Sequence, residues 1–107
     1  MTIEEKIEHA AGLLAEAARP PARVILFGSH ARGDARSGSD VDFLVVERDV
    51  ESSFEESVRL RSKLRGLGIP IDVIVVSERD AEDWGEVKNT IVNAALREGK
   101  VVAERSR

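Results

Sequence analysis

The sequence contains no cysteine among its 107 residues. Disulfide bonds and thiolate metal sites are therefore excluded, and a reducing compartment is compatible with the composition. Long apolar runs are also lacking, since none approaches the roughly 20 residues of a membrane span. The N-terminus is charged from Glu4 onward, unlike a secretory signal. We therefore expect a cytoplasmic protein without a membrane segment.

The sequence also lacks an excess of positive charge. The chain has 16 Lys and Arg against 20 Asp and Glu, which gives a net charge of −4. Broad electrostatic binding of nucleic acid needs clustered basic residues, so we expect no direct DNA binding. The hydrophobic (42%) and charged (34%) fractions are those of an ordinary globular protein. The length predicts one domain spanning residues 1–107.

The N-terminal part predicts a helix followed by a strand. Thr2 and Glu5 have capping-box spacing, and apolar residues recur after them with helical periodicity as far as Pro20. The apolar run Val24–Phe27 predicts a strand covered on both faces. Beyond it, we expect Ser29 to cap one or two short helical turns.

Two further strands are predicted from apolar runs at 40–47 and 69–76. Between them, Ser52 or Ser53 is expected to cap a helix. The apolar stripe expected on this helix is Phe54, Val58, Leu60, Leu64 and Leu67, and its outer face is expected to carry the solvated residues Arg59, Arg61, Lys63 and Arg65.

The C-terminal part predicts one long helix, from Ser77 to about Glu98, and then a small closing strand at Val101–Val102. Its expected inner stripe is Trp84, Val87, Ile91, Val92, Ala95 and Leu96. The order α-β-α-β-α-β-α predicts an α/β fold with a small mixed β-sheet flanked by helices.

The chemistry is concentrated between Gly28 and Asp42. The Gly28-Ser29 pair follows a strand and predicts a turn that presents backbone N–H groups to an anion. Asp40 and Asp42 share one face of the next strand by its two-residue period. Asp72 stands alone in the third apolar run and needs a cation, a polar partner or solvent. If the second and third strands are neighbours, the three carboxylates converge as ligands that suit Mg²⁺.

These residues resemble a known family. Gly-Ser-His-Ala-Arg-Gly at 28–33, Ser-Asp-Val-Asp-Phe-Leu at 39–44 and the downstream Asp72 are similar to the minimal nucleotidyltransferases. These belong to the DNA polymerase beta-like superfamily and include the MntA-type antitoxins, which are paired with HEPN-domain toxins. The similarity covers nearly the whole chain and implies the nucleotidyltransferase fold.

The resemblance also implies roles for the matching positions. Asp40, Asp42 and Asp72 would be catalytic and would hold Mg²⁺, with two Mg²⁺ ions bound together with ATP. Asp72 would also help to remove the proton of the attacking hydroxyl. The residues implied to bind the nucleotide are Gly28, Ser29, Arg32 and Ser39. In the antitoxin branch, AMP passes from ATP to a tyrosine hydroxyl of a HEPN RNase toxin. That acceptor rests on the resemblance alone.

Other interpretations of the same residues stay open. Asp40 and Asp42 are also compatible with a polar strand entrance, and Asp72 with an ion pair to Arg23 or Arg32. An arginine in a first helical turn is as often a surface ion-pair residue as a phosphate ligand. A lone loop histidine such as His30 is more often solvated than catalytic.

The chain matches only the minimal catalytic unit, so we expect a partner or a homo- or hetero-oligomer to complete the acceptor surface. Two other functions are compatible with the sequence. One is a catalytically silent antitoxin or adaptor that acts by binding, and the other is a small-molecule nucleotidyltransferase of the antibiotic-modifying, aminoglycoside type.

Overall fold

Four strands form one mixed sheet in the computed structural model, which describes residues 1–107. The strands are β1 (Ala22–Phe27), β2 (Val41–Glu47), β3 (Ile71–Ser77) and β4 (Lys100–Arg105), and their order in the sheet is β3-β2-β1-β4. β1 is antiparallel to both of its neighbours, whereas β2 and β3 are parallel. The predicted α/β class with a small mixed sheet is confirmed.

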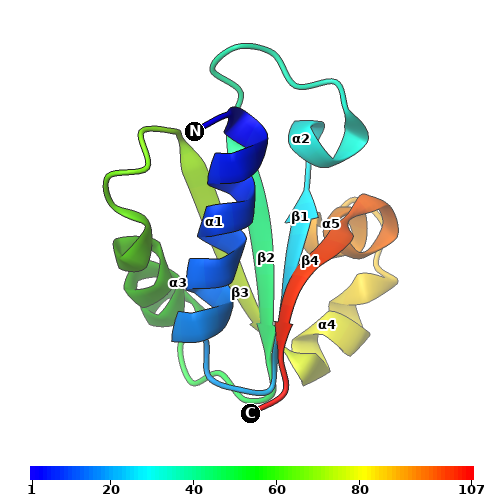
Figure 1. The fold of residues 1–107 in the computed structure, drawn as a ribbon. Helices are drawn as coiled ribbons and strands as arrows, with labels where there is room; N and C mark the ends of the chain where they lie inside the picture. The colour runs from blue at the N-terminus through cyan, green and yellow to red at the C-terminus, as the bar shows by residue number, and fades with distance from the viewer.

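Helices lie on both faces of this sheet (Figure 1). One face carries α1 (Ile3–Ala17) and α3 (Ser53–Arg61), which continues into the 3₁₀ turn Ser62–Leu64. The other face carries α4 (Glu78–Gly85) and α5 (Ile91–Glu98). The four-residue α2 (Ser29–Arg32) lies at the end of β1. The helical layers leave one end of the sheet to α2 and the loops beside it.

The two faces of β2 follow its sequence alternation. Val41, Phe43 and Val45 pack into the core beneath α1 and α3, and Leu44 and Val46 pack into the core beneath α4 and α5. All five are fully buried. Full burial of one such side chain contributes about 1.5–3 kcal/mol, so register is strongly specified. The polar residue at the start of this second face is Asp42.

The first helix matches its sequence signals. The Thr2 hydroxyl accepts a hydrogen bond from the Glu5 backbone N–H, and the Glu5 carboxylate accepts one from the Thr2 N–H. The predicted capping box is therefore confirmed. The helix ends at Ala17, before the Pro20-Pro21 bond, which is cis.

The predicted stripe of α3 is wrong in two positions. Ser52 caps the helix as expected, by accepting a hydrogen bond from the Glu55 N–H. Phe54 and Val58, however, are 77% and 50% exposed, and Glu56 is the residue that is buried. A fixed ion pair satisfies Glu56, so the helix can turn a carboxylate inward and apolar side chains outward.

That ion pair makes the prediction of a fully solvated basic face wrong at Arg59. Two nitrogens of Arg59 donate to the two Glu56 oxygens at 2.8 and 2.7 Å, and one also donates to the Ala17 carbonyl at 2.9 Å. The arginine therefore links α3 to the end of α1. The Arg59 hydrogen bond is the main reason that the pKa of Glu56 is lowered to about 2.

Glu47 lies beside this pair, at the end of β2 opposite to Asp42. Its side chain is 1% exposed, and one carboxyl oxygen accepts a hydrogen bond from the Arg19 N–H at 2.8 Å. The other oxygen, Oε1, is buried without a partner. Burial, followed by the nearby Glu56, raises the pKa of Glu47 to about 7. A proton on this carboxyl group therefore stabilises the folded state.

The prediction of a single long C-terminal helix is wrong. Residues 86–90 separate α4 from α5, and Asn89 adopts a positive φ of 66°, which helical geometry does not allow. The Thr90 hydroxyl accepts a hydrogen bond from the Asn93 N–H and donates to the Val87 carbonyl. Thr90 thereby starts a new helix, so the spacing of the apolar residues no longer follows one axis.

The break exposes part of the predicted inner stripe. Trp84, Val87 and Ile91 are 52%, 41% and 57% exposed, whereas Ala95 is fully buried. After Gly99, the chain forms β4, which confirms and lengthens the closing strand expected at Val101–Val102. No helix of the chain is both long and apolar enough to span a membrane.

Candidate active site

Gly28 makes the turn that joins β1 to α2. Its φ of +78° and ψ of −158° lie in a region that is essentially restricted to glycine. A Cβ atom at this position would lie 2.3 Å from Oδ2 of Asp42, far inside van der Waals contact. The Gly28 turn therefore lies directly against Asp42, because β1 and β2 pair with Phe27 opposite Asp42.

Ser29 is the first residue of α2, and the helix cap is Gly28, without any side-chain cap hydrogen bond. The expectation that Ser29 caps this helix is thus wrong. Because the first N–H groups of any helix lack partners within the helix, those at this turn are suited to an anion. Arg32 closes the turn, and its N–H donates to the Gly28 carbonyl at 3.0 Å.

The parallel pairing of β2 and β3 brings two of the predicted carboxylates together. Asp42 and Asp72 are direct partners in the register, so their side chains share one face of the sheet. Asp40 is exposed and precedes β2 by one residue. The Val41 N–H donates to the Pro70 carbonyl at 2.9 Å, which aligns the starts of both strands.

Asp72 lies at the solvent-exposed start of β3, which explains how an aspartate is tolerated within an apolar run. The alternative of an arginine partner is wrong, because Arg23 pairs with Glu78. Arg32 likewise pairs with other carboxylates, those of Asp34 and Glu98.

The electrostatics of Asp42 link the predicted residues. Its pKa is raised above the ordinary value, first by partial burial and then by the negative charges of Asp72 and Asp40. The charges of His30 and Arg32 act in the opposite direction. The site therefore holds an excess of carboxylate charge, which a bound cation would relieve.

The donor set fits a hard divalent cation, because it consists of carboxylate oxygens without sulfur or imidazole. No group of three or more His, Asp or Glu side chains lies close enough together to hold a metal ion by itself. The three aspartates are thus neighbours but not a complete ligand cage. Mg²⁺ commonly uses one or two carboxylates together with substrate phosphates and water.

The loop between α2 and β2 is tied down by Ser39. Its carbonyl oxygen lies 3.2 Å from Nε2 of His30, and its hydroxyl accepts a hydrogen bond from the Arg36 N–H at 2.8 Å. His30 is half-buried rather than freely solvated. The Ser39 N–H also donates to the Arg36 carbonyl at 2.9 Å, so all three polar groups of Ser39 shape the loop.

Arg32 has two carboxylate partners. Its Nε donates to Asp34 at 3.2 Å, and its Nη1 donates to Glu98 at 3.0 Å. Asp34, followed by Glu98, raises the pKa of the guanidinium group. Sequence reasoning missed Glu98, because no local pattern links residues 66 positions apart.

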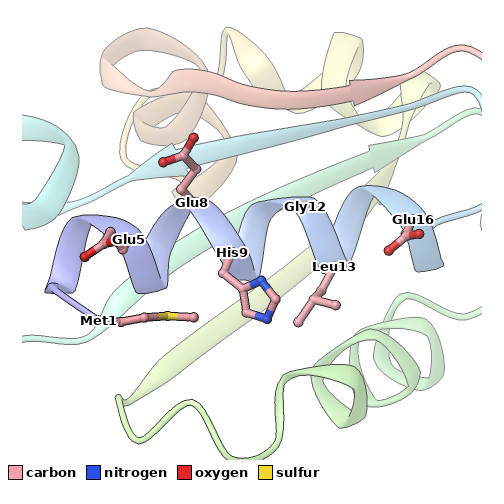
Figure 2. A pocket seen from close by; sticks show the side chains of 7 residues that line it. All are labelled: Met1, Glu5, Glu8, His9, Gly12, Leu13 and Glu16. Atoms are coloured by element: carbon pink, nitrogen blue, oxygen red, sulfur yellow. The ribbon is translucent and has the colours of Figure 1, made fainter.

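Two hollows in the surface lie near or along the N-terminal half of the chain. One, of about 600 Å³, is bordered by His30, Arg36 and Ser39, so it adjoins the loop. The other, of about 570 Å³, runs along the outside of α1, where Met1, His9 and Leu13 lie on the same side of the helix (Figure 2). No predicted site residue lines the second hollow.

Known proteins match this chain in sequence and in fold. A protein from Methanocaldococcus jannaschii, provisionally named a protein adenylyltransferase, is 38% identical over 84 residues, which are 75% of this chain and 76% of that protein. A solved minimal nucleotidyltransferase, itself provisionally assigned, is 33% identical, with a TM-score of 0.60 over 94% of this chain and 95% of its own.

A third similarity shows the fold alone, at 20% identity. It is to the complex of a tri-AMPylated Shewanella oneidensis HEPN toxin with an MNT antitoxin, with a TM-score of 0.54 over 96% of this chain and 74% of that one. The profile of the nucleotidyltransferase domain matches residues 10–99. The chain therefore belongs to the nucleotidyltransferase family.

Proposed function

We propose that this chain is a Mg²⁺-dependent nucleotidyltransferase that moves AMP from ATP to a tyrosine hydroxyl of a HEPN-type RNase toxin and thereby acts as its antitoxin. One observation carries the catalytic part of the proposal. Asp42 faces Asp72 across parallel strands, directly beside the glycine turn at Gly28. A carboxylate pair next to an anion-binding turn suits a metal-bound triphosphate.

In this proposal, Asp40, Asp42 and Asp72 hold the metal. When bound, Mg²⁺ supplies positive charge against the triphosphate and lowers the cost of the charge that develops during transfer. The Gly28-Ser29 turn and Arg32 bind phosphate oxygens, and Ser39 keeps the neighbouring loop in place for the nucleotide. The exposure of Asp72 leaves its carboxylate accessible to an acceptor group.

The reaction is an in-line displacement at the α-phosphorus. The tyrosine oxygen forms a bond to this phosphorus as the bond between the α-phosphorus and the bridging oxygen to the β-phosphate breaks. Pyrophosphate leaves with that electron pair, and the carboxylate of Asp72 takes the proton of the tyrosine hydroxyl. No covalent enzyme intermediate is required.

The acceptor part of the proposal is supported by relatives. The Methanocaldococcus jannaschii relative is named for adenylyl transfer to protein, and the Shewanella oneidensis complex contains an AMPylated HEPN toxin with its antitoxin. The exposed apolar residues Trp84 and Ile91 offer surface for such a partner.

Co-expression with a HEPN-type RNase toxin tests the proposal. Mass spectrometry of the partner should show one or more added AMP units on a tyrosine, and Asp42→Asn should abolish the addition. Asp42→Asn should keep or raise the melting temperature, because it removes one of three repelling carboxylates. Glu82→Ala, at an exposed position of α4, is the matched control and should modify the partner normally.

Two results would contradict the proposal. An unmodified toxin that wild-type and Asp42→Asn chains inhibit equally would indicate an adaptor that acts by binding. Turnover of MgATP with a hydroxylated small molecule such as an aminoglycoside, and with no protein acceptor, would indicate a small-molecule enzyme.

A further inference from the structure

Glu98 reaches the candidate site from the far end of the chain. It is the last residue of α5, and its carboxylate accepts a hydrogen bond from Nη1 of Arg32. Its side chain is 28% exposed, and that of Arg32 is 46% exposed. The ion pair therefore joins the C-terminal helix to the first turn after the glycine loop.

Glycine packing determines where Glu98 lies. Gly99 follows it directly, and a Cβ atom there would lie 2.2 Å from the Ala95 carbonyl oxygen and 2.5 Å from Cγ2 of Ile25. The end of α5 is thus pressed against β1, and the next residue, Lys100, pairs with Leu26. The backbone of Glu98 is therefore fixed by the packing of the next two residues against β1.

The same strand positions the rest of the site. β1 ends at Phe27, opposite Asp42, and leads into Gly28, whose carbonyl accepts the N–H of Arg32. The backbones of Arg32 and Glu98 are therefore both positioned by contacts with the end of β1 and the residue that follows it. Asp34 differs, because it lies only two residues after Arg32 and is not anchored to β1 by a separate element.

The ion pairs leave one side of the guanidinium free. Nε donates to Asp34 and Nη1 to Glu98, while Nη2 makes no hydrogen bond. A free arginine side chain samples many rotamers, whereas one held at two nitrogens presents the third in a defined direction. A phosphate oxygen is the ligand that suits this remaining donor.

We propose that Glu98 is a positioning residue, which holds Arg32 so that Nη2 can donate to the triphosphate of the bound nucleotide. This inference rests on the proposed function. It assigns the C-terminal helix a part in nucleotide affinity. The opposite role, in which Glu98 competes with phosphate for Arg32, predicts the reverse effect on binding.

MgATP affinity, measured by titration calorimetry, separates these roles. Glu98→Ala should weaken binding about two- to fivefold, the range of one exposed ion pair. Glu98→Gln should retain more affinity than Glu98→Ala, because its amide oxygen still accepts the hydrogen bond. In an Arg32→Ala background, Glu98→Ala should have no further effect. Glu82→Ala is the control, and melting temperatures confirm folding of every variant.

Three outcomes would overturn the inference alone, provided that the wild type binds MgATP. These are unchanged affinity in Glu98→Ala, tighter binding in Glu98→Ala, and additive losses in the double variant. A wild-type chain that binds no MgATP would contradict the proposed function, and this inference with it.

Discussion

Replacement of Gly28 by alanine tests the geometry of the site most directly. The backbone there has φ +78° and ψ −158°, and holding a side chain in such a region costs about 1–3 kcal/mol. The new Cβ atom would lie 2.3 Å from Oδ2 of Asp42, so this carboxylate must rotate away. An off-rotamer side chain adds about 0.5–1.5 kcal/mol.

We therefore expect Gly28→Ala to lower the free energy of unfolding by about 1.5–4.5 kcal/mol, measured in urea. Most domains of this size have a free energy of unfolding of about 5–15 kcal/mol, so the variant should stay folded. MgATP affinity should nevertheless fall at least about tenfold, which corresponds to about 1.4 kcal/mol, because both the turn and Asp42 are displaced.

Gly66→Ala is the matched control. Gly66 also has a positive φ, of 85°, but no atom lies within 4 Å of its Cβ position. Its replacement should cost about 1–2 kcal/mol of stability and leave MgATP affinity unchanged. If Gly28→Ala bound MgATP as tightly as the wild type, the close approach of Gly28 to Asp42 would have no role in nucleotide binding, and the reasoning would be refuted.

Two more changes probe the scaffold. Gly99→Ala should lower the free energy of unfolding by about 1–3 kcal/mol, because its Cβ atom would clash with the Ala95 carbonyl oxygen of α5 and with Ile25 of β1. Gly12→Ala, exposed in α1 with open space around it, should raise the free energy of unfolding by about 0.4–1 kcal/mol. If urea unfolding showed both variants to be destabilised, or both to be stabilised, this reasoning would be contradicted. The folded-state pKa of Glu47, about 7, exceeds its ordinary value of 4.5, so its stabilising contribution is complete below pH 4.5 and is lost as the pH rises through 7. Glu47→Gln should remove this pH-dependent loss of stability, which amounts to up to about 3 kcal/mol. The measurement is the free energy of unfolding at pH 5 and at pH 8. If the wild type and Glu47→Gln lost the same amount of stability between these two pH values, the assignment to Glu47 would be contradicted.

Local signals predicted much of the fold. The capping box at Thr2 and the side-chain cap at Ser52 depend on residues three positions apart, and both are present. The two faces of β2 follow from alternation alone. Each of these features is decided within a few residues, so the sequence is sufficient to identify them.

The errors arose where distant partners changed the local preference. Phe54 and Val58 have helical spacing, yet α3 buries Glu56, because Arg59 donates hydrogen bonds to its carboxylate and also to the Ala17 carbonyl. The helix expected from Ser77 to Glu98 is interrupted where Thr90 caps a second helix. The spacing of apolar residues indicates which face of a helix could be buried, but the neighbouring elements decide which face is buried.

The sequence by itself determined the turn at Gly28 and the two faces of β2, because a glycine and a two-residue period act locally, whereas Asp40 lies just before the strand. Only the tertiary structure decided that Asp72 stands opposite Asp42, since this depends on the parallel register of β2 and β3. It also brought Glu98 to Arg32 by packing Gly99 against β1. Residues far apart in the chain meet only when burial of the two cores fixes the order of the strands.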